Sequence, residues 1–407
     1  MLLKVLASFF LSVISLVAQP LVNENGWRPA WGLDRIDQRE AALNDTYNYE
    51  LTGSGVVVYV FDSGINSSHE EFTGRLRPGY NAVNNTNGTE DCSGHGTHTA
   101  SLIGGTTYGV AKQVQFIPVR VLDCKNKNSS SAMLYPAIDW IIEHHQPGVP
   151  AIVNMSVGML KSIPLNEAVR SMIADGLIVV GAAGNQNRDA CLHSPASEPS
   201  IISVGGTDQA ELRAKYSNYG KCVDIFAPAS DLVGGSVGSS NTYRSTSGTS
   251  NAAPIVSGVI ALMLQENPLL NQAQVKEQLK SNATRDALFN IGAGSQNLLV
   301  YSSFSSSSPV PTTTTSVSPT TTVPAVVVTS TTVAPQPIET TTTISSTTTR
   351  YVHPTRPTIP LPDDLSCSKP AERKLFYGTP YVCSVGMWIS KVYTPGRPLI
   401  TVPETTP

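Results

Sequence analysis

Four short apolar runs, separated by stretches with helical spacing, constrain the fold of this 407-residue chain most strongly. They cover residues 56–61, 116–122, 151–157 and 177–182. Between the last three runs, residues 131–145 and 165–176 carry apolar side chains at the spacing of amphipathic helices. Buried strands that alternate with helices predict an α/β domain built on a mainly parallel sheet, with helices on both faces.

The composition divides the chain into unequal parts. The α/β pattern covers residues 29–301, and a tract rich in serine, threonine and proline follows at 302–364. Such a tract has little to bury, so we expect a disordered linker, which O-glycosylation would stiffen into a stalk. Residues 365–407 regain aromatic side chains and contain Cys367 and Cys383, which predicts a small disulfide module. Its aromatic residues suit a binding face or a minimal core equally well.

The first residues predict a secretion signal. Lys4 precedes an apolar run from Val5 to Ala18, which is shorter than the roughly 20 residues needed to span a bilayer. An uncleaved anchor is the competing interpretation, but the run is short and polar sequence follows it. We therefore expect residues 1–19 to be a signal peptide, the protein to be secreted and extracellular, and no membrane span elsewhere. Residues 20–28 then form a short segment before the α/β domain.

Charge and cysteine content narrow the partners and the chemistry. The net charge of −3 provides no basic surface to neutralise many phosphates, so we expect no nucleic-acid partner. Secretion favours disulfides over metal-binding thiolates for the six cysteines. Asn-x-Ser/Thr triplets in polar surroundings predict a glycoprotein; they begin at Asn44, Asn66, Asn84, Asn87, Asn128 and Asn282.

Three polar motifs stand near the carboxyl ends of expected strands, where an open α/β sheet places its functional site. Asp62 ends the run "VYVFD", His95 lies between two glycines in "SGHGTH", and Ser250 precedes an apolar helix in "SGTSNAAP". Alone, the aspartate reads as a turn cap and the serine as a helix N-cap. Together the three supply a nucleophile, a base and a carboxylate that orients the base. Asn185, in "GAAGN", suits an amide donor to a developing oxyanion.

Four motifs, "VFDSGI", "GHGTHTA", "GAAGN" and "SGTSNAAP", in this order resemble the signatures of the subtilisin-like serine proteases, the subtilases. "PAWGLDRI" near the start and "SPASEPS" at 194–200 are similar to the proteinase K branch. The resemblance covers residues 29–301 and implies a subtilisin-like fold and serine endopeptidase activity. It implies that the aspartate, histidine and serine named above form the catalytic triad, and that Asn185 and the Ser250 backbone amide form the oxyanion hole.

The resemblance also implies two disulfides and a specificity pocket. The cysteine spacing is similar to that of aqualysin-like members, which pair Cys92 with Cys124 and Cys191 with Cys222. The residues that match the pocket walls carry no charge; they are Ser156, Val157, Gly158, Ala182, Ala183 and Gly184. We therefore expect broad endopeptidase specificity for proteins or peptides, with apolar residues before the cleaved bond.

A structural calcium ion is the only non-protein group that the resemblance implies, and we expect no organic cofactor. Its ligands would be the carbonyl oxygens of Pro199 and Ile201 and the carboxylate of Asp224, because hard oxygen ligands suit this ion. Asp224 as a turn cap is the simpler alternative. The triplet that begins at Asn154 falls on the strand that pairs with substrate in this family, which predicts that it is buried and unglycosylated.

Three departures from the family pattern bear on activity. Asn251 replaces the usual methionine after the nucleophile, and Ile255 stands where a histidine is usual. The short segment at 20–28 leaves no room for an inhibitory pro-domain, so we expect unaided folding, a pro-domain or inhibitor acting in trans, or a sequence truncated at its start. The alternative function is a catalytically inactive scaffold in a stalked extracellular binding glycoprotein. We expect a monomer in either case.

Overall fold

The computed structural model describes residues 16–21, 30–83, 88–125 and 131–304, and the backbone of three strands between 373 and 390. The chain divides into two compact units, Met1–Thr314 and Thr315–Pro407, which are described separately. In the second unit, three strands form an antiparallel sheet: β16 (Arg373–Phe376), β17 (Thr379–Ser384) and β18 (Met387–Ser390). Cys383 lies on β17, whereas Cys367 and the expected linker at 302–364, apart from its first three residues, fall outside the described residues.

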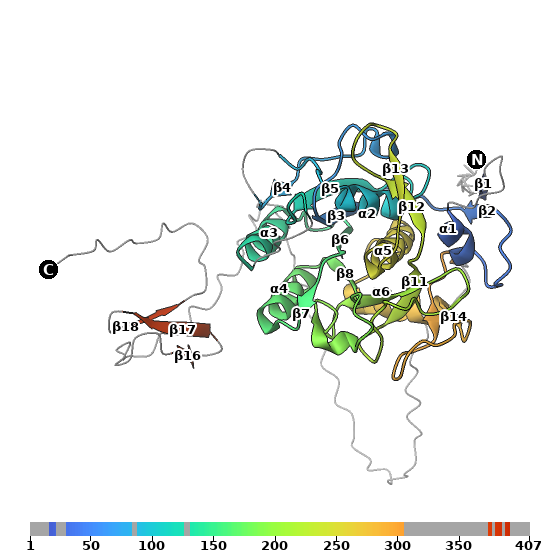
Figure 1. Ribbon diagram of the computed structural model, residues 1–407. Coiled ribbons are helices and arrows are strands. Elements are labelled where there is room, and N and C mark those ends of the chain that lie inside the picture. The colour runs from blue at the N-terminus through green and yellow to red at the C-terminus, as the bar shows by residue number, and fades with distance from the viewer. Residues whose placement is uncertain are drawn as a thin grey trace, which may run out of the picture. The chain divides into compact units, whose positions relative to one another are not determined.

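A nine-stranded sheet forms the centre of the first unit (Figure 1). Its strands are β3 (Val57–Asp62), β4 (Tyr80–Asn81), β5 (Gln115–Arg120), β6 (Ala151–Met155), β8 (Ile178–Ala182), β10 (Ile202–Thr207), β11 (Ile225–Pro228), β14 (Thr284–Arg285) and β15 (Leu298–Leu299). They lie in the order β14-β15-β11-β10-β8-β6-β3-β5-β4, and every neighbouring pair is parallel except β14 and β15. The four apolar runs form β3, β5, β6 and β8, so the predicted mainly parallel sheet is confirmed.

Helices cover both faces of this sheet because its strands are apolar on both sides. The helices are α1 (Trp31–Ile36), α2 (His95–Gly104), α3 (Ser131–His144), α4 (Ile163–Ala174), α5 (Thr249–Glu266) and α6 (Gln272–Asn282). Along β3, Val58 and Val60 join a core with residues of α2 and α5, whereas Tyr59 and Phe61 join a second core with residues of α3 and α4. Successive side chains of a strand point to opposite faces, so one strand contributes to both cores.

Helix α5 lies inside the domain. Every residue from Asn251 to Leu264 is buried, as expected of a helix that is apolar on all sides. Pro254 stands inside the helix, where its missing N–H leaves the carbonyl oxygen of Ser250, four residues earlier, without a helical donor; that oxygen accepts a hydrogen bond from Ser156 Oγ instead. Within the described part of the chain, no helix has the length and apolar character needed to cross a membrane.

Shorter elements complete the first unit. They are the 3-10 turns η1 (Glu70–Phe72) and η2 (Ala190–Leu192) and the paired strands β1 (Val17–Pro20) with β2 (Thr46–Tyr49), β7 (Met159–Leu160) with β9 (His193–Ser194), and β12 (Leu232–Gly235) with β13 (Tyr243–Thr246). The end of the expected signal peptide thus lies in β1, while residues 1–15 are outside the described residues. Among the expected glycosylation sites, Asn44 is exposed. Asn84, Asn87 and Asn128 lie outside the described residues.

Candidate active site

The carboxylate of Asp62 lies at the carboxyl end of β3 and is fully buried. Its Oδ1 is 2.7 Å from Nδ1 of His95, the first residue of α2. The same oxygen accepts a hydrogen bond from the Ser63 backbone N–H at 2.7 Å, and Oδ2 accepts one from Thr99 Oγ1 at 3.2 Å. A buried charge is stable only with such partners, so the carboxylate fixes the orientation of the imidazole ring.

A second buried carboxylate, Asp91, shapes the loop that leads into α2. It accepts hydrogen bonds from the backbone N–H groups of Ser93, Gly94 and Thr97, each at 2.9 Å. It also accepts one from Ser63 Oγ at 2.9 Å, which links the loop to the residue after Asp62. Asp91 therefore satisfies two of the amides at the start of α2, those of Gly94 and Thr97, and links this loop through Ser63 to the end of β3.

Glycine is required beside the histidine because the backbones approach very closely. A Cβ atom at Gly96 would lie 2.1 Å from the carbonyl oxygen of Gly64. The two segments therefore pack in direct backbone contact, which keeps α2 against the end of β3. This contact explains the glycine after His95 in the motif.

Two histidines one turn apart on α2 have opposite electrostatic environments. Burial lowers the pKa of His95, but the charge of Asp62 and the hydrogen bond to it outweigh burial, so the pKa is raised above 6.5. Burial lowers the pKa of His98 to about 3, so this ring is neutral at physiological pH. Its Nε2 is 3.1 Å from the carbonyl oxygen of Leu232 on β12. The raised pKa of His95 is compatible with proton transfer by this ring, whereas the neutral His98 ring is held by its contact with the backbone.

Ser250 and Asn185 meet at the first turn of α5. A Cβ atom built on Gly248 would lie 2.9 Å from Ser250 Oγ and 3.4 Å from Asn185 Nδ2. Both polar atoms therefore lie close to the same side of Gly248. Asn185 Oδ1 accepts hydrogen bonds from the backbone N–H and from Oγ1 of Thr249, both at 2.8 Å. These two bonds fix the amide oxygen and, because the amide group is planar, the orientation of its nitrogen as well.

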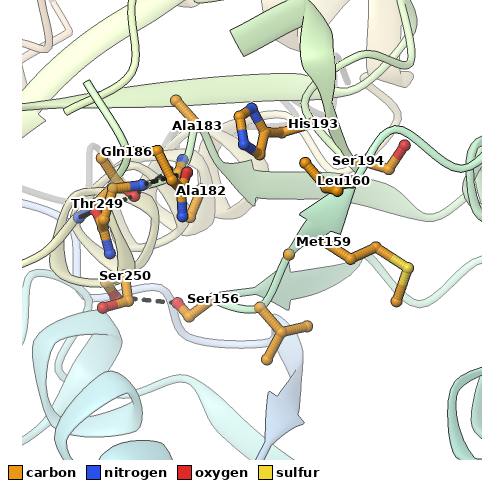
Figure 2. A pocket seen from close by; sticks show the side chains of 14 residues that line it. Ser156, Met159, Leu160, Ala182, Ala183, Gln186, His193, Ser194, Thr249 and Ser250 are labelled. Atoms are coloured by element: carbon orange, nitrogen blue, oxygen red, sulfur yellow. Dashed lines mark hydrogen bonds between the residues drawn. The ribbon is translucent and has the colours of Figure 1, made fainter. Parts of the chain in front are cut away.

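A cavity of about 240 Å³ opens beside Ser250 (Figure 2). All six residues expected in the pocket walls line it, together with Asn185 and Ser250. The Ser156 hydroxyl donates to the backbone carbonyl of Ser250 at 3.0 Å, which ties one wall to α5. The register of the sheet explains the arrangement, because Met155 pairs with Gly181 and the two walls follow these residues side by side.

Both departures next to Ser250 are accommodated by packing. Asn251 is buried, its amide donates to the carbonyl oxygens of Thr246 and Ala229 at 2.8 and 3.1 Å, and its oxygen accepts from Thr246 Oγ1 at 3.1 Å. Ile255 is buried within the core that contains α2 and α5. Asn154 is also fully buried and hydrogen bonded to Ser156 and Ser257, which leaves no room for a glycan.

The structure contains two disulfides in this unit. Cys92 is bonded to Cys124, with a Cα–Cα distance of 4.9 Å, and joins the loop before His95 to the segment after β5. Cys191 is bonded to Cys222, with a Cα–Cα distance of 5.2 Å. The first cross-link limits the motion of the loop that Asp91 organises.

The three oxygen ligands expected for calcium come together, but around a lysine. The Nζ atom of Lys276 donates to the carbonyl oxygens of Pro199 and Ile201 at 2.9 and 2.7 Å and lies 2.8 Å from Asp224 Oδ2. These residues therefore do not fit a bound calcium ion. Elsewhere among the described residues, no cluster of three or more His, Cys, Asp or Glu side chains is arranged to hold a metal ion.

Sequence reasoning missed several residues that build the site. Thr249 lies inside the motif "SGTSNAAP" and Asp91 lies three residues before "GHGTHTA", and in both places the neighbouring residues drew attention instead. His193 lines the cavity and is buried, with Nδ1 3.3 Å from the amide nitrogen of Asn218. Its position directly before "SPASEPS" is the one available signal. Met159 and Leu160, on β7, also line the cavity through pairing with β9.

Comparison with known proteins identifies related chains. The profile of the subtilase family matches residues 53–299. An extracellular serine proteinase of Thermus sp. (strain Rt41A) is 48% identical over 274 residues, which are 67% of this chain and 66% of that protein. Alkaline serine exoprotease A of Vibrio alginolyticus is 41% identical over 71% of this chain and 53% of its own length. The matched region thus spans less than two thirds of both relatives.

A solved structure is also similar. The crystal structure of a cold adapted subtilisin-like serine proteinase has a TM-score of 0.65 and 43% sequence identity, and the match covers 68% of this chain and 98% of that chain. The similarity therefore extends through nearly all of that smaller chain.

The charge of Asp62 is expected to control the titration of His95. In NMR spectra of the imidazole groups, the midpoint for His95 should lie above 6.5. Asp62→Asn removes the negative charge but keeps the volume of the side chain, so the midpoint should fall. His98 serves as the internal control, because its pKa of about 3 leaves it neutral throughout the titration. An unchanged His95 midpoint in the variant would contradict this account.

Proposed function

We propose, from the premise that this chain belongs to the subtilase family, that it is a secreted serine endopeptidase acting through an acyl-enzyme. The observations that carry the proposal are the Asp62–His95 pair and the pocket that Ser250 and Asn185 line. Asp62 and His95 are 2.7 Å apart, and Ser250 Oγ and Asn185 Nδ2 surround a common point beside the pocket. Two relatives named as an extracellular serine proteinase and an alkaline serine exoprotease support this chemistry and secretion.

In the first step, neutral His95 accepts the proton of Ser250 as Oγ attacks the carbonyl carbon of a peptide bond. Asp62 stabilises the imidazolium that forms, because its carboxylate is already aligned with Nδ1. His95 then donates the proton to the leaving amine, and an ester between the substrate and Ser250 remains. Water, activated by the same histidine, hydrolyses the ester and restores the serine.

Asn185 and the Ser250 backbone N–H donate hydrogen bonds to the oxyanion of the tetrahedral intermediate. The N-terminal end of α5 supports this role because its amides carry a partial positive charge. Thr249 is a positioning residue, since its two hydrogen bonds hold the Asn185 amide in the productive orientation. These donors act most strongly on the transition state, where the negative charge is greatest.

The cavity binds the substrate side chain that precedes the cleaved bond. No Lys, Arg, Asp or Glu is present among the 14 residues that line it. Small residues form its two walls, and Met159 and Leu160 add apolar surface at one end. An uncharged cavity of about 240 Å³ favours apolar side chains and offers no counter-charge to a basic one.

The inactive scaffold receives no support from the site. An inert domain has no need to keep a buried carboxylate paired with a histidine, nor an asparagine amide oriented by Thr249. The described strands of the C-terminal unit do not indicate a binding function. Proteolysis is therefore the function that the geometry favours.

A fluorophosphonate probe tests the nucleophile directly. The purified protein should become labelled in proportion to active sites, and Ser250→Ala should abolish labelling, because the probe bonds only to an activated hydroxyl. Ser247→Ala, which alters an exposed serine three residues earlier, is the matched control and should be labelled normally. Absence of labelling in correctly folded protein would favour the scaffold.

Removal of the oxyanion donor should reduce turnover without unfolding the protein. Asn185→Ala is expected to lower kcat by about 10²- to 10³-fold, a magnitude known from an oxyanion-hole asparagine in subtilisin itself. Asn267→Ala, at the opposite end of α5, should retain kcat and controls for general effects on the helix. Kinetics with a peptide amide give the comparison, and an unchanged kcat for Asn185→Ala would exclude that residue from the mechanism.

Profiling a peptide library tests the expected specificity. Cleavage should follow apolar residues, with broad tolerance at other positions, because the pocket walls are uncharged. The measurement is kcat/KM for each residue before the cleaved bond. A sharp preference for lysine or arginine would contradict this assignment of the pocket.

A further inference from the structure

The ammonium group of Lys276 lies in a cage of three oxygen atoms on the first unit. It donates to the carbonyl oxygens of Pro199 at 2.9 Å and Ile201 at 2.7 Å, and it is 2.8 Å from Asp224 Oδ2. Its side chain is 20% exposed and that of Asp224 is 12% exposed, so the group is largely withdrawn from water. Three acceptors match the three N–H donors of an ammonium group.

A second lysine occupies the other oxygen of the same carboxylate. Lys280 Nζ is 2.8 Å from Asp224 Oδ1, and the Ser203 backbone N–H donates to Oδ2 at 3.0 Å. Two ammonium groups thus face one carboxylate, which gives the cluster a net positive charge. A divalent cation would have to displace Lys276 and remain next to Lys280, and like charges at such a distance repel strongly.

Helix α6 delivers these groups from one face. Gln272, Lys276 and Lys280 are spaced by four residues, so they lie above one another along the helix. Gln272 Nε2 donates to the carbonyl oxygen of Ser200 at 2.8 Å, and its Oε1 accepts from the Val179 N–H on β8 at 2.9 Å. One helix face therefore holds the segment around Ser200, the strand beside it and the Asp224 carboxylate.

We propose that the Lys276 ammonium group is the built-in structural cation of this site and takes the place of a bound calcium ion. It joins the 199–201 segment to Asp224, directly before β11, and thereby holds the connection between β9, which lines the cavity, and β10. The site then stabilises the fold whether or not calcium is available. This inference concerns stability and does not depend on the proposed function.

Thermal unfolding of the full-length chain tests the proposal. All variants carry Ser250→Ala, so self-digestion does not affect the melting temperature. In EDTA, Lys276→Ser should lower the melting temperature by about 3 °C or more, as expected for loss of a partly buried ion pair in a domain of this size. Lys215→Ser, which alters an exposed lysine, is the matched control and should leave the melting temperature unchanged.

Calcium chloride distinguishes the built-in cation from a metal. Millimolar calcium should shift the melting temperatures of the parent protein and of Asp224→Asn by the same amount. The proposal leaves no calcium bound at Asp224, and any calcium bound at another site would not depend on this carboxylate. In the double variant Lys276→Ser with Lys280→Ser, calcium should raise the melting temperature by more than it does in the parent protein. Adding Asp224→Asn to this double variant should remove that additional increase. If this double variant folds only with calcium present, that result also supports the proposal.

Two results would overturn the inference. One is a calcium-dependent shift in the parent protein that disappears on Asp224→Asn, since the ion would then occupy this site despite Lys276. The other is a melting temperature for Lys276→Ser in EDTA equal to that of Lys215→Ser, since the ammonium group would then have no structural role.

Discussion

The fully buried carboxylate of Asp62 is the constraint on which the site depends. A charge at the end of a central strand is stable only if several donors converge on it, and the chain provides His95, the Ser63 N–H and the Thr99 hydroxyl. Two of these donors lie on α2, so satisfying the charge also fixes that helix against β3. The same requirement orients the imidazole ring and raises its pKa above 6.5. The packing of this region and the proposed function of His95 therefore depend on one interaction.

The other half of the site depends on the register of the parallel sheet. Pairing of Met155 with Gly181 places the segments after β6 and β8 beside each other, and these segments become the walls of the cavity. Asn185 follows β8 and is bound through Thr249 to the start of α5. Because the core surrounds α5 almost completely, the helix presents its first turn at a fixed position. The residues proposed to react thus come from four elements of the first unit.

The sequence predicted those features whose signal is local. Continuous apolar runs identified the central strands β3, β5, β6 and β8, and motifs a few residues long indicated Asp62, His95, Asn185 and Ser250 as candidate site residues. Features defined by distant partners were beyond this reasoning: Asp91 becomes important through amides that the fold brings to it, and His193 through the cavity it lines. Lys276 is the clearest case, because in "QVKEQLK" it reads as a solvated lysine of an amphipathic helix. Only the tertiary structure brings it to the carbonyl oxygens expected to bind calcium.

The most direct test of the central claim is a crystal structure of the protein inactivated by a peptidyl phosphonate, whose tetrahedral phosphorus imitates the intermediate. The account predicts a bond from Ser250 Oγ to phosphorus, a phosphonyl oxygen within hydrogen-bond distance of Asn185 Nδ2 and the Ser250 N–H, and Nδ1 of His95 still bonded to Asp62. Modification of another residue, or a phosphonyl oxygen directed away from Asn185, would contradict it.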